Sequence, residues 1–345
     1  MEQIIFEAVD NYSEVDKYIA AHSEGRIFLV CGKSFERTKF YSHLKGTRVE
    51  IDRFSDFRPN PTYESVTAGV EEFLQSEANF ILAAGGGSAL DVAKCIKLYS
   101  GKNPKLFAMP TTAGTGSEAT KFAVIYKDGE KQSVTDESII PDAVLFDSSA
   151  LDFLPMYHRK AAMLDALCHG IESFWSVNAT PESRILSEKA ITGILAGMED
   201  FLKNDGEANK KMLAAANTAG RAINMTQTTA GHAMCYKLTS LYGIAHGYAA
   251  ALCVDVLWSW MEKNCAEKNL RETLSCLGKI LSADDFRKIL DDLKLGGVNI
   301  SSADIEYLSS SVNPVRLKNH PVTMTKETIR ELYETIGKRN KADES

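Results

Sequence analysis

FILAAGGGS, residues Phe80–Ser88, is the stretch of sequence that decides the fold. Its five apolar residues predict a buried strand, and the glycines with Ser88 predict a tight turn that opens a helix ending near Tyr99. Glycines let a backbone approach a phosphate closely, and a helix N-terminus offers unpaired N–H groups. The segment is not the GxGxxG fingerprint of dinucleotide-binding folds. It is typical of a phosphate-binding turn, and a tight turn without a ligand is the alternative.

Similar units surround this segment in the first 150 residues. We predict further strands at 26–31, 47–51, 106–109, 123–126 and 143–146, and a helix at 63–76. Strands that alternate with helices predict a mostly parallel sheet with helices on both faces. This part of the chain is therefore predicted to be an α/β nucleotide-binding domain with a Rossmann-like parallel sheet.

The sequence pattern changes after about residue 155, where strand signals nearly vanish and alanine becomes frequent. Helical patterns cover residues 159–176, 181–202, 209–226 and 249–262. The change predicts a boundary near Leu154-Pro155. We therefore expect an α/β domain over residues 1–154 and an all-α domain over residues 155–345.

Bulk composition limits the class of protein. The 345 residues include 44% hydrophobic and 25% charged residues, which is ordinary for a soluble globular protein. The net charge of -7 argues against a nucleic-acid partner but allows a local positive pocket for an anionic substrate. The sequence shows neither the apolar core of a signal peptide nor an apolar membrane span. Seven scattered cysteines without a CxxC pair predict free thiols, so we expect a cytoplasmic protein with no membrane partner.

A second polar loop, PTTAGTGSE at residues 110–118, follows the strand predicted at 106–109. Such a loop can place hydroxyl and N–H groups around a polar ligand, whereas a Ser/Thr-rich surface loop is the alternative. Two loops of this kind at the ends of neighbouring strands favour a shared nucleotide site.

Metal-ligand residue types occur in two clusters. Asp165 and His169 are four residues apart in a predicted helix, so they share one helix face. His232 and His246 flank a segment of small and apolar residues. Three imidazoles and one carboxylate suit a first-row divalent cation such as iron(II) or zinc(II). Spacing alone leaves hydrogen-bonded core histidines as an open alternative.

Four motifs in order resemble the iron-containing (group III) alcohol dehydrogenases. They are GGGSALDVAK (85–94), PTTAGTGSEAT (110–120), DALCHGIES (165–173) and HAMCYKLTSLYGIAHG (232–247), and the resemblance covers nearly the whole chain. It implies an NAD(P)-dependent interconversion of a small aldehyde and a primary alcohol. It also implies one divalent metal, with iron(II) favoured over zinc(II), bound by Asp165, His169, His232 and His246. The resemblance further implies contacts to NAD(P)H from Asn60, Gly86, Gly87, Ser88, Asp91, Thr111, Thr112, Thr115, Thr120, Val124 and Lys131.

Two positions depart from the family pattern. Many relatives carry an aspartate after the first strand, where it meets the adenosine ribose, but this chain has Gly32 followed by Lys33. Without that carboxylate a 2′-phosphate is not repelled, so NADP(H) is acceptable as well as NAD(H). Relatives also often carry a histidine four residues after the third ligand. Tyr236 stands there in this chain, which removes one candidate proton-transfer group.

Polar segments beside the later ligands bear on the substrate. Residues 219–247 and VNPVRLKNHP (312–321) resemble the phosphonoacetaldehyde reductase branch of the family, which reduces phosphonoacetaldehyde to 2-hydroxyethylphosphonate. Lys237, Arg316 and Lys318 could bind the oxyanion, although cations in loops are usually solvated. Another small aldehyde or diol, of the lactaldehyde, propanediol or glycerol type, is the alternative substrate. A dehydroquinate-synthase-like cyclase is a remote alternative, and a homodimer is the default assembly.

Overall fold

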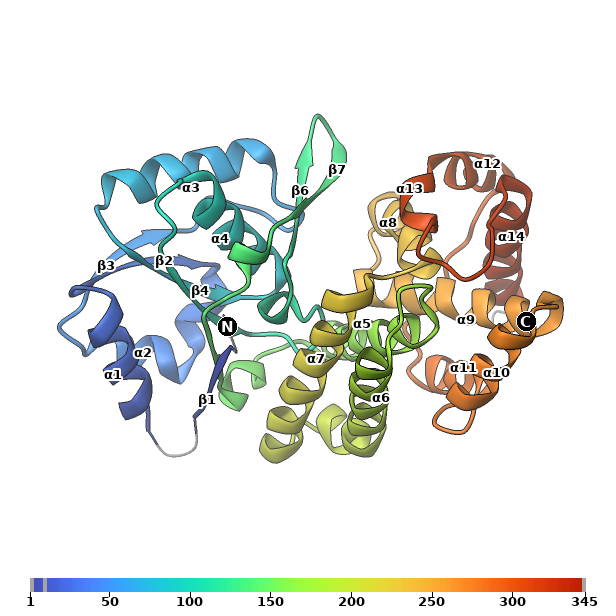
Figure 1. Cartoon of the computed structure of the whole chain (residues 1–345), viewed down its shortest axis with the longest axis horizontal. Coiled ribbons are helices and arrows are strands. Elements are labelled where there is room, and N and C mark those ends of the chain that lie inside the picture. The colour runs from blue at the N-terminus through green and yellow to red at the C-terminus, as the bar shows by residue number, and fades with distance from the viewer. Residues whose placement is uncertain (1–2, 9–10, 343–345) are drawn as a thin grey trace. The chain divides into compact units, whose positions relative to one another are not determined.

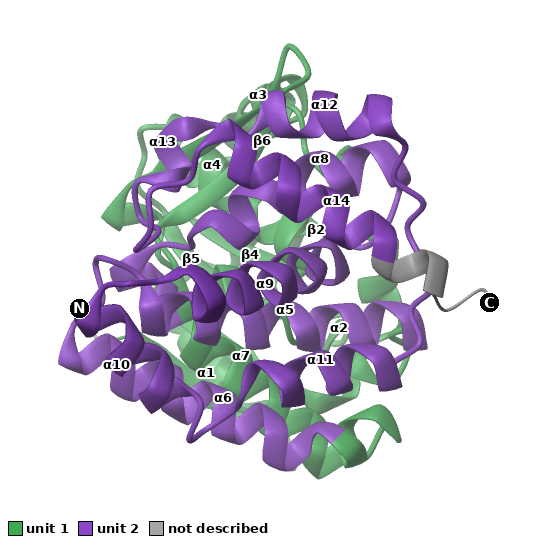
Figure 2. Cartoon of the chain, turned by 90° about the vertical axis from the view of Figure 1, so that its right-hand side faces the viewer, with its two compact units in different colours: residues 1–154, 199–220 green, residues 155–198, 221–345 purple. Residues whose placement is uncertain are grey.

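The structure is a computed structural model, and it describes residues 3–8 and 11–342. Contacts divide the chain into two compact units, which Figure 2 shows in green and purple. Unit 1 joins residues 1–154 with 199–220, and unit 2 joins residues 155–198 with 221–345. The first crossing between the units falls at Leu154-Pro155, where the sequence pattern changes.

Unit 1 is built on a six-stranded sheet with the order β1-β8-β5-β4-β2-β3, in which every neighbouring pair is parallel. Its strands are β1 (Ile4–Glu7), β2 (Arg26–Cys31), β3 (Glu50–Phe54), β4 (Phe80–Gly85), β5 (Lys105–Pro110) and β8 (Ala143–Phe146). A separate antiparallel hairpin consists of β6 (Phe122–Lys127) and β7 (Glu130–Thr135). The parallel sheet confirms the predicted α/β architecture of the N-terminal part.

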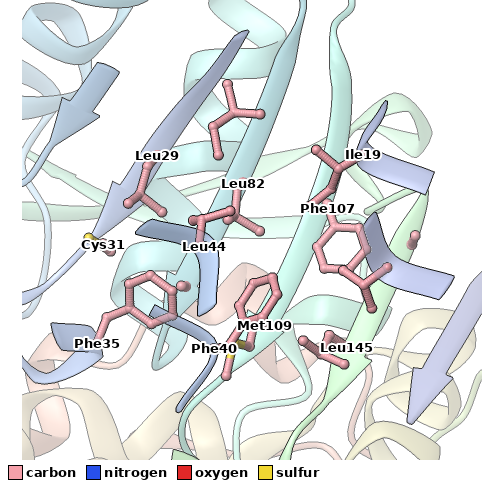
Figure 3. Packing of buried hydrophobic residues seen from close by; sticks show 14 of the residues in the cluster. Ile19, Leu29, Cys31, Phe35, Phe40, Leu44, Leu82, Phe107, Met109 and Leu145 are labelled. Carbon is pink, nitrogen blue, oxygen red and sulfur yellow. The ribbon is translucent and has the colours of Figure 1, made fainter. Parts of the chain in front are cut away.

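Helices cover both faces of this sheet (Figure 1). They are α1 (Ser13–His22), α2 (Lys39–Lys45), α3 (Tyr63–Gln75) and α4 (Gly87–Tyr99). Side chains alternate between the faces of a strand, and β2 shows the result. Leu29 joins Ile19 of α1 and Leu44 of α2 in one buried cluster (Figure 3). Phe28 points to the other face, where its ring centroid lies 5.3 Å from that of Phe73 in α3.

Some strands differ from the prediction. The strand expected at 47–51 begins three residues later, as β3. The strand expected at 123–126 forms as β6, but it pairs with β7 and not with the parallel sheet. Neither β1 nor β7 was predicted. Strand β1 is a four-residue edge strand with Ile4 46% exposed, and β7 has the polar sequence EKQSVT, so both lack the signal of a buried strand.

Helices are the regular secondary structure of the described residues of unit 2, and loops without strands join them, which confirms the all-α prediction. Its helices are α5 (Met156–Trp175), α6 (Pro181–Leu202), α7 (Gly206–Thr226), α8 (Ala230–Tyr242), α9 (His246–Asn264), α10 (Lys268–Leu277), α11 (Ala283–Asp292), α12 (Ser302–Ser311), α13 (Pro314–Leu317) and α14 (Lys326–Ala342), and parts of α6 and α7 belong to unit 1. Within the described ranges, no helix is both long enough and apolar enough to cross a bilayer.

Residues 199–220 pack with unit 1 although they follow the predicted boundary. The backbones of Gly116 and Gly220 touch, since a Cβ atom on Gly220 would lie 2.9 Å from the Gly116 Cα. The Asn217 side-chain amide donates a hydrogen bond to Glu118 (3.3 Å). The two compact units therefore differ from the predicted division, because residues 199–220 belong to unit 1. The division into domains at residues 1–154 and 155–345 stays a prediction.

Candidate functional site

The two polar loops of unit 1 touch each other. They follow β4 and β5, which are neighbours in the parallel sheet, so both leave the same edge. The Thr111 N–H donates to the Gly85 carbonyl (2.9 Å). A Cβ atom on Gly87 would lie 2.9 Å from the Thr115 Cγ2, so a larger residue there would force the Thr115 side chain to move. The sequence pattern thus brings the two predicted nucleotide loops together.

The turn after β4 opens helix α4 at Gly87. Gly86 is the N-cap, and no side chain of the described residues caps this end. The N–H groups of the first helical turn, which includes Gly87 and Ser88, therefore point out of the helix. Such N–H groups with the partial positive charge of the helix form a suitable site for a phosphate.

Asp91 of α4 forms hydrogen bonds with the second loop and with strand β6. One carboxylate oxygen accepts from the Ser117 hydroxyl (2.6 Å) and the other accepts from the Val124 N–H of β6 (3.0 Å). Burial raises the pKa of Asp91 above its ordinary value, and the positive charge of Lys94 opposes that rise. The carboxylate that the resemblance assigns to the cofactor thus already binds two groups of the protein.

The remaining predicted cofactor residues lie in the same connected segments. Thr120 is buried directly after the second loop. Lys131 pairs with Tyr126 across the hairpin. The Tyr126 N–H donates to the Pro61 carbonyl (2.8 Å), which places exposed Asn60, in the left-handed region with φ 60°, beside the hairpin. All eleven predicted cofactor residues therefore belong to unit 1.

The predicted metal ligands meet in unit 2 around one oxygen atom. Asp165 and His169 lie on the same face of α5, whereas His232 lies in α8 and His246 begins α9. The Asp165 Oδ1 is 3.3 Å from the His232 Nε2, 3.7 Å from the His169 Nε2 and 3.8 Å from the His246 Nε2. The ligand atoms of Asp165, His232 and His246 all lie within 4.8 Å of one another.

These separations fit a metal site. Metal–nitrogen bonds of about 2.0–2.1 Å at the tetrahedral angle place neighbouring ligand atoms about 3.3–3.4 Å apart. The Asp165–His232 separation of 3.3 Å matches that value, and the separations of 3.7 Å to His169 and 3.8 Å to His246 are somewhat longer. The donor set, one carboxylate with three imidazoles, suits iron(II) or zinc(II).

A close helix contact brings His246 to the ligand group. The next residue, Gly247, packs against α5, where a Cβ atom would lie 2.7 Å from the Asp165 Cβ and 2.0 Å from the Ala161 carbonyl oxygen. A larger residue there would push the start of α9 away from Asp165. The glycine after the histidine thus sets the distance between two predicted ligands.

Glu172 contacts a predicted ligand, His232, although the sequence analysis did not single it out. It is fully buried, and its Oε2 hydrogen-bonds to the His232 Nδ1. Its Oε1 accepts from the Thr229 hydroxyl (2.6 Å) and from the Thr229 and Gly231 N–H groups (both 3.0 Å). A carboxylate on Nδ1 keeps the proton there and leaves Nε2 free to bind a metal. Its spacing of seven residues from Asp165, on the same face of α5, was the available signal.

Charges within the cluster shift the titration of its members. Burial alone would raise the pKa of Asp165, but His169, His246 and His232 hold it below its ordinary value. Burial alone would lower the pKa of His232, but Glu172 and Asp165 raise it to about 9. The two carboxylates thus create a negative site that attracts a proton or a metal cation.

Tyr236 connects the ligand group to a cation. Its ring stacks on the ring of His246, with centroids 5.5 Å apart and planes 9° apart. The Arg316 Nη1 donates to the Tyr236 hydroxyl (3.3 Å), and the guanidinium lies 5.0 Å from the centre of the ring. Lys237 is half-buried in α8, and Lys318 is exposed after α13. Arg316 therefore contacts the ring that stacks on His246.

Comparison with known proteins identifies the family. Residues 2–148 match the model of iron-containing alcohol dehydrogenases, and residues 160–337 match the model of the C-terminal part of the same family. The chain belongs to the iron-containing alcohol dehydrogenase family. This protein is therefore an oxidoreductase of the alcohol and aldehyde class, as the order of its motifs predicted.

Individual relatives of this iron-containing alcohol dehydrogenase share its length. It is 26% identical to a phosphonoacetaldehyde reductase of Streptomyces viridochromogenes, over 93% of this chain and 91% of that protein. An iron-containing alcohol dehydrogenase of Thermotoga maritima has a TM-score of 0.87 and 26% identity, over 97% of this chain and 98% of that one. A sulfoacetaldehyde reductase of Bifidobacterium kashiwanohense, solved with NAD+, has a TM-score of 0.83 and 25% identity, over 97% of both chains.

Proposed function

We propose that this protein is a metal-dependent NAD(P)H-linked reductase of a small anionic aldehyde, and that it reduces phosphonoacetaldehyde to 2-hydroxyethylphosphonate. The observation that carries the proposal is the convergence of three imidazole nitrogens on the Asp165 Oδ1, in a chain whose family is iron-containing. Arg316 beside this group favours a substrate with a negative charge.

In this proposal Asp165, His169, His232 and His246 hold one divalent metal, iron(II) by preference. When bound, the metal supplies Lewis-acid polarisation of the carbonyl, and the reduced nicotinamide supplies the hydride. Glu172 holds the proton of His232 on Nδ1 and so keeps its Nε2 available. Tyr236 limits the movement of the His246 ring by stacking on it.

The cofactor in this proposal binds to unit 1. Gly86, Gly87 and Ser88 at the start of α4 receive the pyrophosphate. Thr111, Thr112 and Thr115 offer hydroxyl groups from the second loop, with Asn60, Asp91, Thr120, Val124 and Lys131 in the segments around them. The Bifidobacterium relative that carries NAD+ supports a nicotinamide cofactor. Gly32 and Lys33, directly after β2, leave NADP(H) acceptable as well.

Arg316 is the main substrate residue in this proposal, with Lys237 and Lys318 as further candidates. A guanidinium can form two parallel hydrogen bonds with a phosphonate or a sulfonate. Two of the relatives above are reductases of phosphonoacetaldehyde and sulfoacetaldehyde, whose names describe aldehydes with such a group. An arginine near the metal ligands therefore offers a physical reason for the preference.

The test compares two substrates in the metal-loaded protein by following NADH or NADPH at 340 nm. We expect Arg316→Ala to raise KM for phosphonoacetaldehyde roughly 10- to 100-fold, because a hydrogen bond to a charged group contributes about 1.5–3 kcal/mol. KM for propanal should change little. Arg271→Ala, which removes an exposed arginine of α10, is the matched control.

Other outcomes would contradict parts of the proposal. Equal effects of Arg316→Ala on both aldehydes would refute the anionic substrate and favour a lactaldehyde-, propanediol- or glycerol-type substrate. Activity without steady consumption of NAD(P)H would refute the reductase and favour a cyclase. The homodimer and the cytoplasmic location stay predictions.

A further inference from the structure

We propose that Lys94 is a positioning residue of the cofactor site. Its buried ammonium group fixes the end of the PTTAGTGSE loop to helix α4 and thereby holds the loop in the form that receives the nicotinamide cofactor. The inference rests on the proposed function, because it assumes that this loop of unit 1 binds the cofactor.

The contacts of Lys94 reach three points of one segment. The side chain is completely buried, and its Nζ donates to the Ser117 hydroxyl (3.1 Å), the Thr120 hydroxyl (3.1 Å) and the Phe122 carbonyl (2.8 Å). An ammonium group has three N–H donors. All three are used, and they hold a stretch of six residues that joins the second loop to strand β6.

Negative charges compensate for the burial of this cation. Burial lowers the pKa of Lys94 to about 8, and the negative charges of Asp91 and Glu118 oppose that fall. Ser117 links the lysine to Asp91, because its hydroxyl accepts from Lys94 and donates to the Asp91 carboxylate (2.6 Å). Two side chains of α4, one turn apart, therefore hold the same loop residue.

Stability alone does not account for this arrangement. Replacing a buried ion pair by apolar residues of similar volume is often neutral or stabilising, so a charged network is an inefficient way to fill a core. The loop is also held on its other sides, by the contact of Gly87 with Thr115 and by the contact of Gly116 with Gly220. Lys94 is buried and contacts Ser117 and Thr120 at the end of the loop. It therefore acts on the cofactor through these two residues, as a positioning residue does.

The experiment uses the full-length, metal-loaded protein and three measurements. Lys94→Met removes the charge and the donors but keeps a side chain of similar length. Lys97→Met is the matched control, because Lys97 is also buried in α4 but binds Asp142 (3.0 Å) instead of the loop. For each variant we would measure Kd for NADH and NADPH by fluorescence, KM and kcat, and amide hydrogen exchange.

We expect Lys94→Met to raise Kd and KM for the cofactor roughly tenfold, which corresponds to about 1.4 kcal/mol. At saturating cofactor kcat should change little. Amide exchange should become faster over residues 111–122, while metal content stays the same because the predicted ligands belong to unit 2. Lys97→Met should lower the thermal midpoint without changing the Kd of the cofactor.

Three results would overturn the role of Lys94. They are an unchanged cofactor Kd in Lys94→Met, an equal rise of Kd in Lys97→Met, and a loss of kcat at unchanged KM. If Lys94→Met does not fold, Ser117→Ala removes one acceptor of Lys94 and one donor to Asp91, and the same rise in Kd is expected. A wild-type protein that binds neither NADH nor NADPH would instead contradict the proposed function.

Discussion

Replacing Glu172 by glutamine should weaken metal binding without disturbing unit 1, because Glu172 belongs to unit 2. The carboxylate is fully buried and accepts hydrogen bonds from His232, Thr229 and Gly231. Glutamine has the same shape but only one acceptor oxygen. If that oxygen faces the N–H groups of Thr229 and Gly231, its NH2 group faces the His232 Nδ1. The imidazole must then move its proton to Nε2, where it blocks a bond to the metal.

The expected loss of metal affinity follows from this change of the His232 tautomer. Loss of an outer hydrogen bond to a metal-binding histidine typically costs 10- to 100-fold in metal affinity, or about 1.4–2.7 kcal/mol. Competition with a chromophoric chelator, for iron(II) and for zinc(II), measures this affinity directly. Asp255→Asn is the matched control, because Asp255 is a buried carboxylate of α9 that binds Arg287 (3.1 Å). Wild-type affinity in Glu172→Gln, or an equal loss in Asp255→Asn, would refute the assigned role.

Two further variants test the cofactor turn and a buried histidine. Gly87→Ala should raise the cofactor Kd roughly tenfold, about 1.4 kcal/mol, because its methyl group would lie 2.9 Å from Thr115. Gly197→Ala is the control and should leave the Kd unchanged, because its methyl group would meet no atom within 4 Å. The same Kd in both variants would count against the contact between Gly87 and the second loop. Burial lowers the pKa of His320 to about 4, so its contribution to stability is present above pH 6.5 and is lost as the pH falls toward 4. Urea unfolding of His320→Phe should therefore show roughly 2 kcal/mol less loss of stability than wild type between pH 7 and pH 5, and parallel pH curves would contradict this.

Local patterns predicted much of the fold. Strand β4, the glycine turn and helix α4 follow one another within 20 residues, so their signals stand next to each other in the sequence. Strands with few buried side chains gave weaker signals, as β1 and β7 show. The helical period of residues 199–220 was visible, but periodicity does not say which unit a helix packs against.

The candidate site shows the same limit. The shared helix face of Asp165 and His169 follows from their spacing, but their contact with His232 joins residues more than 60 positions apart, and only the order of the family motifs suggested it. Glu172 lies on that same face and was passed over, because glutamates in helices are usually exposed. The contact of Arg316 with Tyr236 is likewise a product of the tertiary fold. As ligands and cofactor contacts, these residues stay predictions.

The contact between Gly116 and Gly220 has a consequence for protein engineering. Because residues 199–220 pack with unit 1, the chain passes between the units three times, at 154/155, 198/199 and 220/221. No single cut therefore releases unit 1 whole. A fragment that ends at Leu154 would keep all six strands of the sheet but lose the backbone that covers Gly116. A chimera that borrows unit 1 of a relative must exchange residues 1–154 and 199–220 together.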